Sequence, residues 1–288
     1  MVIDAHQHFW RFNPIRDGWI TDEMAAIRRD FLPGDLEPEL EACGVDATIA
    51  VQADQSEAET EFLLRLAEGN RRIAGVVGWV DLRSPEVERR LEHFSRYKKF
   101  RGVRHVAQAE ADDRFLVRPD FMRGVRKLKE FGLAYDILIY PRQLPAAIEL
   151  IEKLPEQKFV VDHLAKPEIK ANKVEPWAAL IREIAANPNV YCKLSGMVTE
   201  ADWKKWKPAD FEPYLDVVFD AFGVKRLLFG SDWPVCLVAA SYHQIKNIVE
   251  LRAEVCTPRA KSAIFGDNAV SFYSLANGQP KQGTGLFA

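Results

Sequence analysis

The chain has 288 residues, of which 48% are apolar and 28% are charged, as is ordinary for a folded globular protein. This length fits two average domains or one large α/β barrel, because such barrels commonly run to about 250 residues. The formal net charge is −3, and both signs are mixed along the chain, so no basic stripe points to a nucleic-acid partner and there is no acidic tail.

The amino terminus does not resemble a signal peptide, because Asp4, His6 and His8 interrupt its apolar run and no basic segment precedes it. No apolar run approaches the roughly 20 residues of a membrane span. We therefore expect a cytoplasmic protein without a membrane partner, and the oligomeric state stays open, a homo-oligomer included. Four scattered cysteines form no CxxC pair, which predicts free thiols in a reducing compartment. They are Cys43, Cys192, Cys236 and Cys256.

Eight short, β-rich apolar runs recur along the chain. Most are near-continuous apolar strings, as expected of parallel strands that are covered on both faces. The runs span residues 2–9, 47–54, 72–82, 100–107, 134–141, 158–167, 189–196 and 226–235.

Helical patterns separate these runs, and several begin or end with capping residues. Strand and helix signals in alternation predict a parallel sheet. Eight strands without a glycine-rich dinucleotide fingerprint favour a single-domain (β/α)₈ barrel over residues 1–276, followed by a polar C-terminal tail over 277–288. The helical patterns span 35–44, 57–70, 84–97, 118–132, 144–155, 174–188 and 211–223.

The first run, "VIDAHQHFW", carries His6 and His8 at alternate positions. Side chains alternate across a strand, so both imidazoles point to the same side. In a barrel of this kind the active-site groups lie at the carboxyl ends of the strands. Such a pair can bind a metal, line an anion pocket or polarise a carbonyl, and backbone-bound histidines are the structural alternative.

Two further ionisable groups fall at strand ends. His163 follows the sixth run in "VVDHLAKP", where we expect Asp162 to point the other way and to be structural. Asp232 follows the eighth run in "FGSDWPV". A carboxylate that emerges there can act as a general base toward water or as a metal ligand, although it could instead cap a helix. Three histidines and a carboxylate can also form a zinc site.

Other polar and aromatic side chains near strand ends are candidates for binding substrate. Arg104 and His105 face opposite sides of their strand, so only one of them can face the lumen unless the strand bends. A guanidinium or an ammonium can bind an anionic or hydroxylated ligand, and an indole can stack on a ring. Surface or core roles are the alternatives for each. The candidates are Arg104, His105, Tyr140, Arg142, Lys166 and Trp233.

Four motifs resemble those of the amidohydrolase superfamily: "DAHQHFW", "RGVRH", "DHLAKP" and "FGSDWPV". They occur in the family's order, and the resemblance covers about residues 2–275. More narrowly, the sequence is similar to the amidohydrolase-2 branch of sugar and pyrone lactonases, such as L-fuconolactonases and L-rhamnonolactonases. The resemblance implies a distorted (β/α)₈ barrel. It implies that His6 and His8 are the strand-one pair, His163 the strand-six histidine, and Asp232 the aspartate that activates water.

The chain departs from many superfamily members at the fourth and fifth strands. The fifth run has no histidine and the fourth has no lysine, which argues against a binuclear metal centre. The lactonase branch has at most one divalent ion, and some members resemble metal-free enzymes. Two possibilities therefore stay open: one Zn²⁺ bound by His6, His8, His163 and Asp232, or no metal at all.

These residues lead to the hypothesis of a hydrolase that opens an aldonolactone of the L-fucono or L-rhamnono type to its sugar acid. Asp232 would take a proton from water, and His6, His8 and His163 would polarise the carbonyl, either directly or through a metal. Two alternatives stay open: a zinc-dependent decarboxylase of an aromatic or muconate-type acid in the same superfamily, and a barrel that only binds a sugar acid.

Overall fold

The computed structural model describes residues 1–275, so the predicted tail over 277–288 lies outside the described residues. Eight strands form within the eight predicted runs. They are β1 (Ile3–Gln7), β2 (Ala47–Val51), β3 (Ile73–Gly78), β4 (Phe100–His105), β5 (Ala134–Ile137), β6 (Phe159–Val161), β7 (Val190–Leu194) and β8 (Leu227–Phe229).

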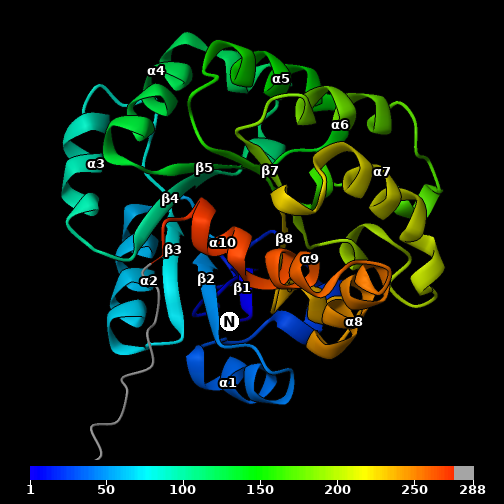
Figure 1. The fold of residues 1–288 in the computed structure, drawn as a ribbon. Helices are drawn as coiled ribbons and strands as arrows, with labels where there is room; N and C mark the ends of the chain where they lie inside the picture. Colours follow the sequence, from blue (N-terminus) through cyan, green and yellow to red (C-terminus); the bar gives the residue numbers. More distant parts are fainter. Residues whose placement is uncertain (276–288) are drawn as a thin grey trace, which may run out of the picture.

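The strands pair in parallel in the order β1 to β8. The sheet closes on itself through a parallel bridge between Gln7, at the end of β1, and Trp233, after β8. Helices follow the strands around the outside of the barrel (Figure 1). The predicted single-domain (β/α)₈ architecture is confirmed.

Seven helices of the barrel form within or beside the predicted helical patterns, and three more follow β8. None of the helices between residues 1 and 275 is long and apolar enough to cross a bilayer. The helices are α1 (Pro33–Ala42), α2 (Glu57–Gly69), α3 (Val87–Ser95), α4 (Pro119–Leu128), α5 (Leu144–Lys153), α6 (Trp177–Ala185), α7 (Glu212–Phe222), α8 (Tyr242–Ala253), α9 (Pro258–Ser262) and α10 (Asn268–Phe272).

The amino-terminal half of the barrel lumen is apolar. Side chains from the strands, among them Ile3, Ile49, Val160 and Leu228, form one buried cluster. Phe272 of α10 belongs to the same cluster, and α10 lies in front of the strands in Figure 1. The C-terminal helix therefore covers this end of the lumen, and the opposite end, where the strands finish, is left for the site.

All eight predicted runs extend beyond the observed strands, and the excess is largest for the sixth and the eighth. The runs 158–167 and 226–235 continue beyond β6 and β8, but only three residues of each pair with neighbouring strands. After β6 the backbone enters the left-handed region, with positive φ at each residue from His163 to Lys166, and after β8 Asp232 has a φ of 57°. These turns end the pairing at the two positions where the sequence places its candidate catalytic side chains.

The segment 10–30 after β1 is a long insert between β1 and α1. It begins and ends at an antiparallel bridge between Trp10 and Phe31 and contains a 3₁₀ helix over Asp22–Ile27. The indole Nε1 of Trp10 donates to the carbonyl oxygen of Arg29 at 2.8 Å, and the ring packs edge-on against Phe31. Because these contacts join the two ends of the insert, they hold it against the end of the barrel where β1 ends.

Candidate active site

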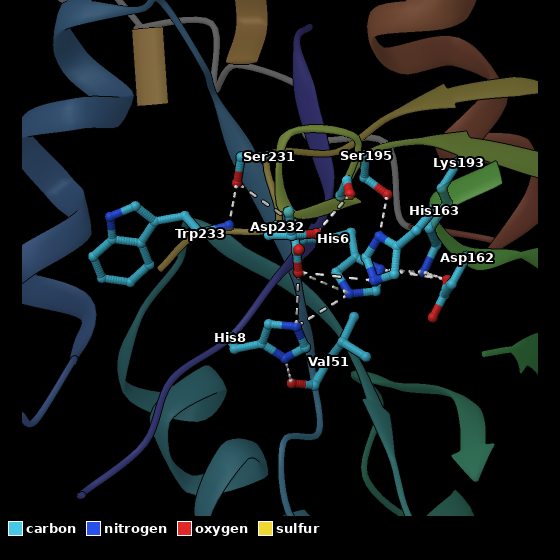
Figure 2. Close-up of polar contacts among 12 residues, drawn as sticks. His6, His8, Val51, Asp162, His163, Lys193, Ser195, Ser231, Asp232 and Trp233 are labelled. Carbon is cyan, nitrogen blue, oxygen red and sulfur yellow. Dashed lines mark hydrogen bonds and ion pairs between the residues drawn. The ribbon is translucent and has the colours of Figure 1, made fainter. Parts of the chain in front are cut away.

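Three imidazoles and one carboxylate meet at the carboxyl ends of β1, β6 and β8 (Figure 2). The Nε2 atoms of His6 and His8 are 3.1 Å apart. Asp232 Oδ1 lies 3.3 Å from His8 Nε2 and 3.8 Å from the Nε2 atoms of His6 and His163. All four residues are buried. The structure thus brings together the four residues that the sequence singles out.

The second nitrogen of each imidazole has a partner outside this group, which orients the ring. His8 Nδ1 lies 2.8 Å from the carbonyl oxygen of Val51, so it must carry the proton and donate. His163 Nδ1 lies 2.9 Å from Ser195 Oγ. His6 Nδ1 lies 3.4 Å from Asp162 Oδ1 and 3.1 Å from Lys193 Nζ. With the Nδ1 atoms engaged, the Nε2 atoms face the common centre (Figure 2).

The turn that presents His163 is a strained backbone segment. His163, Leu164, Ala165 and Lys166 have φ angles of 51–57°, and left-handed geometry costs about 1–2 kcal/mol for each non-glycine residue. Two hydrogen bonds hold the turn: Lys166 N donates to His163 O and Trp177 Nε1 donates to Leu164 O, both at 2.7 Å. Strain that is maintained in this way is typical of functional sites.

Two glycines allow the histidines to approach neighbouring strands closely. A Cβ built on Gly196 would lie 2.4 Å from His163 Nδ1, and the φ of Gly196 is +60°. A Cβ on Gly230 would lie 2.7 Å from His6 Cβ. Any side chain at either position would therefore displace an imidazole of the site.

The donor set fits one zinc ion. Zinc takes imidazole nitrogen at about 2.0–2.1 Å and carboxylate oxygen at about 2.0–2.2 Å, which places the ligand atoms of a tetrahedral site about 3.3–3.6 Å apart. The separations among His6, His8 and Asp232, 3.1–3.8 Å, bracket this spacing, whereas His163 belongs to a second possible ligand group with His6 and Asp162. His6, His8 and Asp232 can hold a divalent metal.

A layer of buried charges lies directly beneath His6. Lys193 Nζ is 2.5 Å from Asp136 Oδ2 and 2.9 Å from Asp162 Oδ1. Arg104 Nη1 lies 3.1 Å from Asp162 Oδ2 and 3.3 Å from His6 Nε2. Two cations thus face two carboxylates, a balance that a buried ionic group requires.

The expectation that Asp162 points away from the site is wrong, because its Oδ1 lies 3.4 Å from His6 Nδ1. It assumes strict alternation, but the left-handed turn begins at His163 and lets both side chains reach the site. Asp136 is absent from the sequence-based candidates altogether. The signal that could have found it is a single carboxylate inside an apolar run at a lumen-facing position.

The electrostatic environment keeps the Asp232 carboxyl ionised. Burial raises the pKa of its carboxyl, but His163 and a hydrogen bond with His8 outweigh burial and hold the pKa below its usual 3.8. Burial also lowers the pKa values of His6 and His163 well below the ordinary 6.5. At neutral pH the site therefore contains an ionised carboxylate and, at these two positions, neutral imidazoles.

A cavity of about 320 Å³ opens above this group, within the range of small-molecule sites. Of the residues predicted to bind substrate, Arg104 and Lys166 line it. Lys166 Nζ also contacts Glu200 Oε1 at 2.9 Å. The rest of the cavity wall comes from loop residues that are not among the sequence-based candidates. It includes Arg16, Trp19, Asp54, Gln55 and Gln108.

The structure does not bring the other four predicted substrate-binding residues to this cavity. His105 points outward, where it stacks on Phe115 and its Nε2 lies 2.7 Å from Glu110 Oε1. It faces away because Arg104 takes the lumen side of β4. The indole of Trp233 is buried between aromatic rings and points away from the histidines in Figure 2. Tyr140 and Arg142 line a neighbouring cavity that shares only Lys166 with the site.

Comparisons with known proteins agree with this geometry. The sequence pattern of the family described as "Amidohydrolase" matches residues 3–275. The chain is 44% identical to an L-fucono-1,5-lactonase of Burkholderia multivorans, over 95% of this chain and 96% of that protein. It is 40% identical to an L-fucono-1,5-lactonase of Burkholderia ambifaria, over 95% of each chain.

A solved structure extends the likeness to three dimensions. The crystal structure of an amidohydrolase from Burkholderia multivorans with bound zinc superposes with a TM-score of 0.93 at 43% identity, covering 96% of this chain and 100% of that one. Together with the match over residues 3–275, this likeness shows that the chain belongs to the amidohydrolase family.

Proposed function

We propose that this protein is a lactonase that opens a sugar lactone of the L-fucono-1,5 type to its sugar acid. One observation carries the proposal: an ionised carboxylate, Asp232, lies among three imidazoles at the floor of a cavity of sugar size. The two relatives named as L-fucono-1,5-lactonases, at 40% and 44% identity over nearly the whole chain, support this choice of substrate.

In the proposed reaction Asp232 is the general base. A water molecule attacks the lactone carbonyl carbon while Asp232 takes one of its protons. The lowered pKa of Asp232 keeps the carboxylate ionised at neutral pH, so it is ready to accept that proton. The attack produces a tetrahedral intermediate whose former carbonyl oxygen carries a negative charge.

The intermediate collapses when the bond between the carbonyl carbon and the ring oxygen breaks. Asp232, now protonated, returns its proton to the ring oxygen, which leaves as a hydroxyl on the same molecule. The new carboxylic acid then ionises, so each turnover consumes one lactone and one water and releases one sugar-acid anion and one proton.

His6, His8 and Asp232 form one group of possible ligands and would hold the divalent ion, with His163 Nε2 beside them, 3.8 Å from Asp232 Oδ1. When bound, such an ion polarises the carbonyl and increases the acidity of water. The chain's own cations act beside it: we assign Arg104 and Lys166 to hold substrate oxygens, because both line the cavity. Loss of a donor to the developing oxyanion typically costs on the order of 10²–10³ in turnover.

The test is proton release from a panel of aldonolactones in weakly buffered solution, with carbon dioxide measured in parallel on aromatic and muconate-type acids. We expect protons from L-fucono-type lactones and no carbon dioxide. Carbon dioxide release without lactone opening would instead support the decarboxylase alternative, and neither product would support the binding alternative.

Metal dependence is tested by dialysis against a strong chelator, followed by metal analysis and activity measurement. We expect one zinc per chain before dialysis, loss of activity with loss of the metal, and recovery on addition of Zn²⁺. Full activity in protein free of metal would favour the metal-free mechanism. Three further expectations stay predictions: a cytoplasmic location, a homo-oligomeric state and the absence of a nucleic-acid partner.

A further inference from the structure

Two residues at the cavity wall have no role in the proposed chemistry: Trp19 in the insert after β1 and Asp54 after β2. Trp19 is 43% exposed, which is unusual for an indole. Its ring packs edge-on against buried Trp10, with centroids 5.9 Å apart and an interplanar angle of 86°. This contact fixes one edge of the Trp19 ring, and exposed surface of the ring remains at the cavity.

Asp54 differs from the other charged residues of the wall in its pairing. Arg16 is paired with Asp17 at 2.8 Å, Arg104 with Asp162 at 3.1 Å and Lys166 with Glu200 at 2.9 Å. The backbone of Asp54 is bonded, since its N–H donates to Glu59 and its carbonyl accepts from Ser56 N.

The carboxylate of Asp54, in contrast, has no hydrogen-bond donor and no cation within 4.0 Å among residues 1–275. A carboxylate has about four lone-pair positions, and two of them can accept from neighbouring hydroxyls. The hydroxyls of a sugar ring are donors of this kind. The same charge repels a ligand that carries a carboxylate of its own.

We propose that Trp19 and Asp54 form the selecting wall of this site, with the indole against the C–H face of the lactone ring and the carboxylate accepting hydrogen bonds from adjacent ring hydroxyls. This inference rests on the proposed lactonase function and deepens it. The selected class is a neutral lactone with adjacent hydroxyls, in preference to unsubstituted or carboxylate-bearing lactones.

The experiment compares Asp54→Asn with the unaltered enzyme on three substrates: an L-fucono-type lactone, an unsubstituted lactone of equal ring size and a lactone that carries a carboxylate. We expect kcat/KM for the hydroxylated lactone to fall about 10- to 100-fold, mainly through KM, because hydrogen bonds to charged groups are strong. We expect the unsubstituted lactone to change by less than about twofold, and the carboxylate-bearing lactone to improve.

Trp19→Ala tests the apolar part of the wall. We expect kcat/KM to fall about three- to tenfold for both uncharged lactones, and Trp19→Phe to restore part of the loss, since both depend on ring contact. Trp19 is 43% exposed and Asp54 is half-buried, so we expect the variants to fold, which thermal unfolding will check. The matched controls are Glu61→Gln, at a half-exposed residue of α2, and Ile15→Ala, at an exposed residue of the same insert; neither residue lines the cavity.

An equal loss on the hydroxylated and unsubstituted lactones with Asp54→Asn, or no loss on either, would overturn the selecting wall and leave the lactonase proposal standing. Failure of the unaltered enzyme to open any lactone would overturn both. If the control variants lowered kcat/KM as much as Asp54→Asn does, this result would also contradict the selecting wall, because the loss would then not depend on a position in the cavity.

Discussion

The two halves of the barrel lumen contrast in composition although the same strands build both. Toward the amino ends, Val160 of β6 and Leu228 of β8 pack in an apolar cluster with side chains of α10. A few residues later the same two segments present Asp162 and Asp232 to the site. One end of each strand thus supports stability and the other supports chemistry, as the barrel architecture allows.

The difference lies in what each half requires of its neighbours. An apolar side chain in the lower half needs only close packing. In the upper half, Lys193 is fully buried and depends on Asp136 and Asp162 for its charge to be tolerated. Substitutions in the two halves should therefore separate loss of stability from loss of activity, and the following predictions use this separation.

The largest effect is expected from Asp232→Asn. Asparagine has nearly the same shape and tolerates the left-handed φ of 57°, so folding should be preserved. Without the base, kcat/KM should fall about 10³-fold. Steady-state kinetics and thermal unfolding measure the two quantities, and an enzyme that keeps its full turnover would refute the assignment of the base.

Asp136→Leu should reduce stability by about 3–5 kcal/mol, because it leaves Lys193 with one carboxylate fewer in the lumen and removes the acceptor of the Tyr273 hydroxyl. The double variant Asp136→Leu/Lys193→Met should be less destabilised than the sum of the two single variants. Urea unfolding measures all of them, and simple additivity would show that the two buried charges are not coupled.

Leu228→Ala probes the apolar half. The side chain is fully buried, so its truncation should reduce stability by about 3 kcal/mol. At a temperature where the variant is folded, kcat should stay within about twofold. A large loss of kcat in folded protein would mean that packing in the lower half controls the geometry of the upper half.

The smallest effect is expected from a pair of glycine variants that share a left-handed backbone. Gly132→Ala, at a φ of +67° with open space around it, should cost about 1 kcal/mol and leave activity unchanged. Gly196→Ala adds a clash with His163 and should also lower kcat/KM about tenfold. Equal kinetics in the two variants would contradict the close-approach argument.

Local patterns predicted most of the fold. The eight strands appear in the eight apolar runs, because a strand that is covered on both faces must be apolar along its length. The strand ends were less predictable. The runs at 158–167 and 226–235 contain left-handed turns at His163 and Asp232, and no residue type in either run requires such a turn. Backbone of that kind is imposed by its surroundings, such as the bond from Trp177 to Leu164.

Sequence by itself determined the parallel barrel and the four groups His6, His8, His163 and Asp232, because periodicity and the position of polar residues after apolar strands are local properties. Only the tertiary structure decided which neighbours they have. It turned His105 and Trp233 away from the site, brought Asp162, Asp136 and Lys193 beneath His6, and placed Trp19 and Asp54 at the wall. The physical reason is that loop conformation and cross-barrel contacts depend on residues far apart in the chain, which no local pattern records.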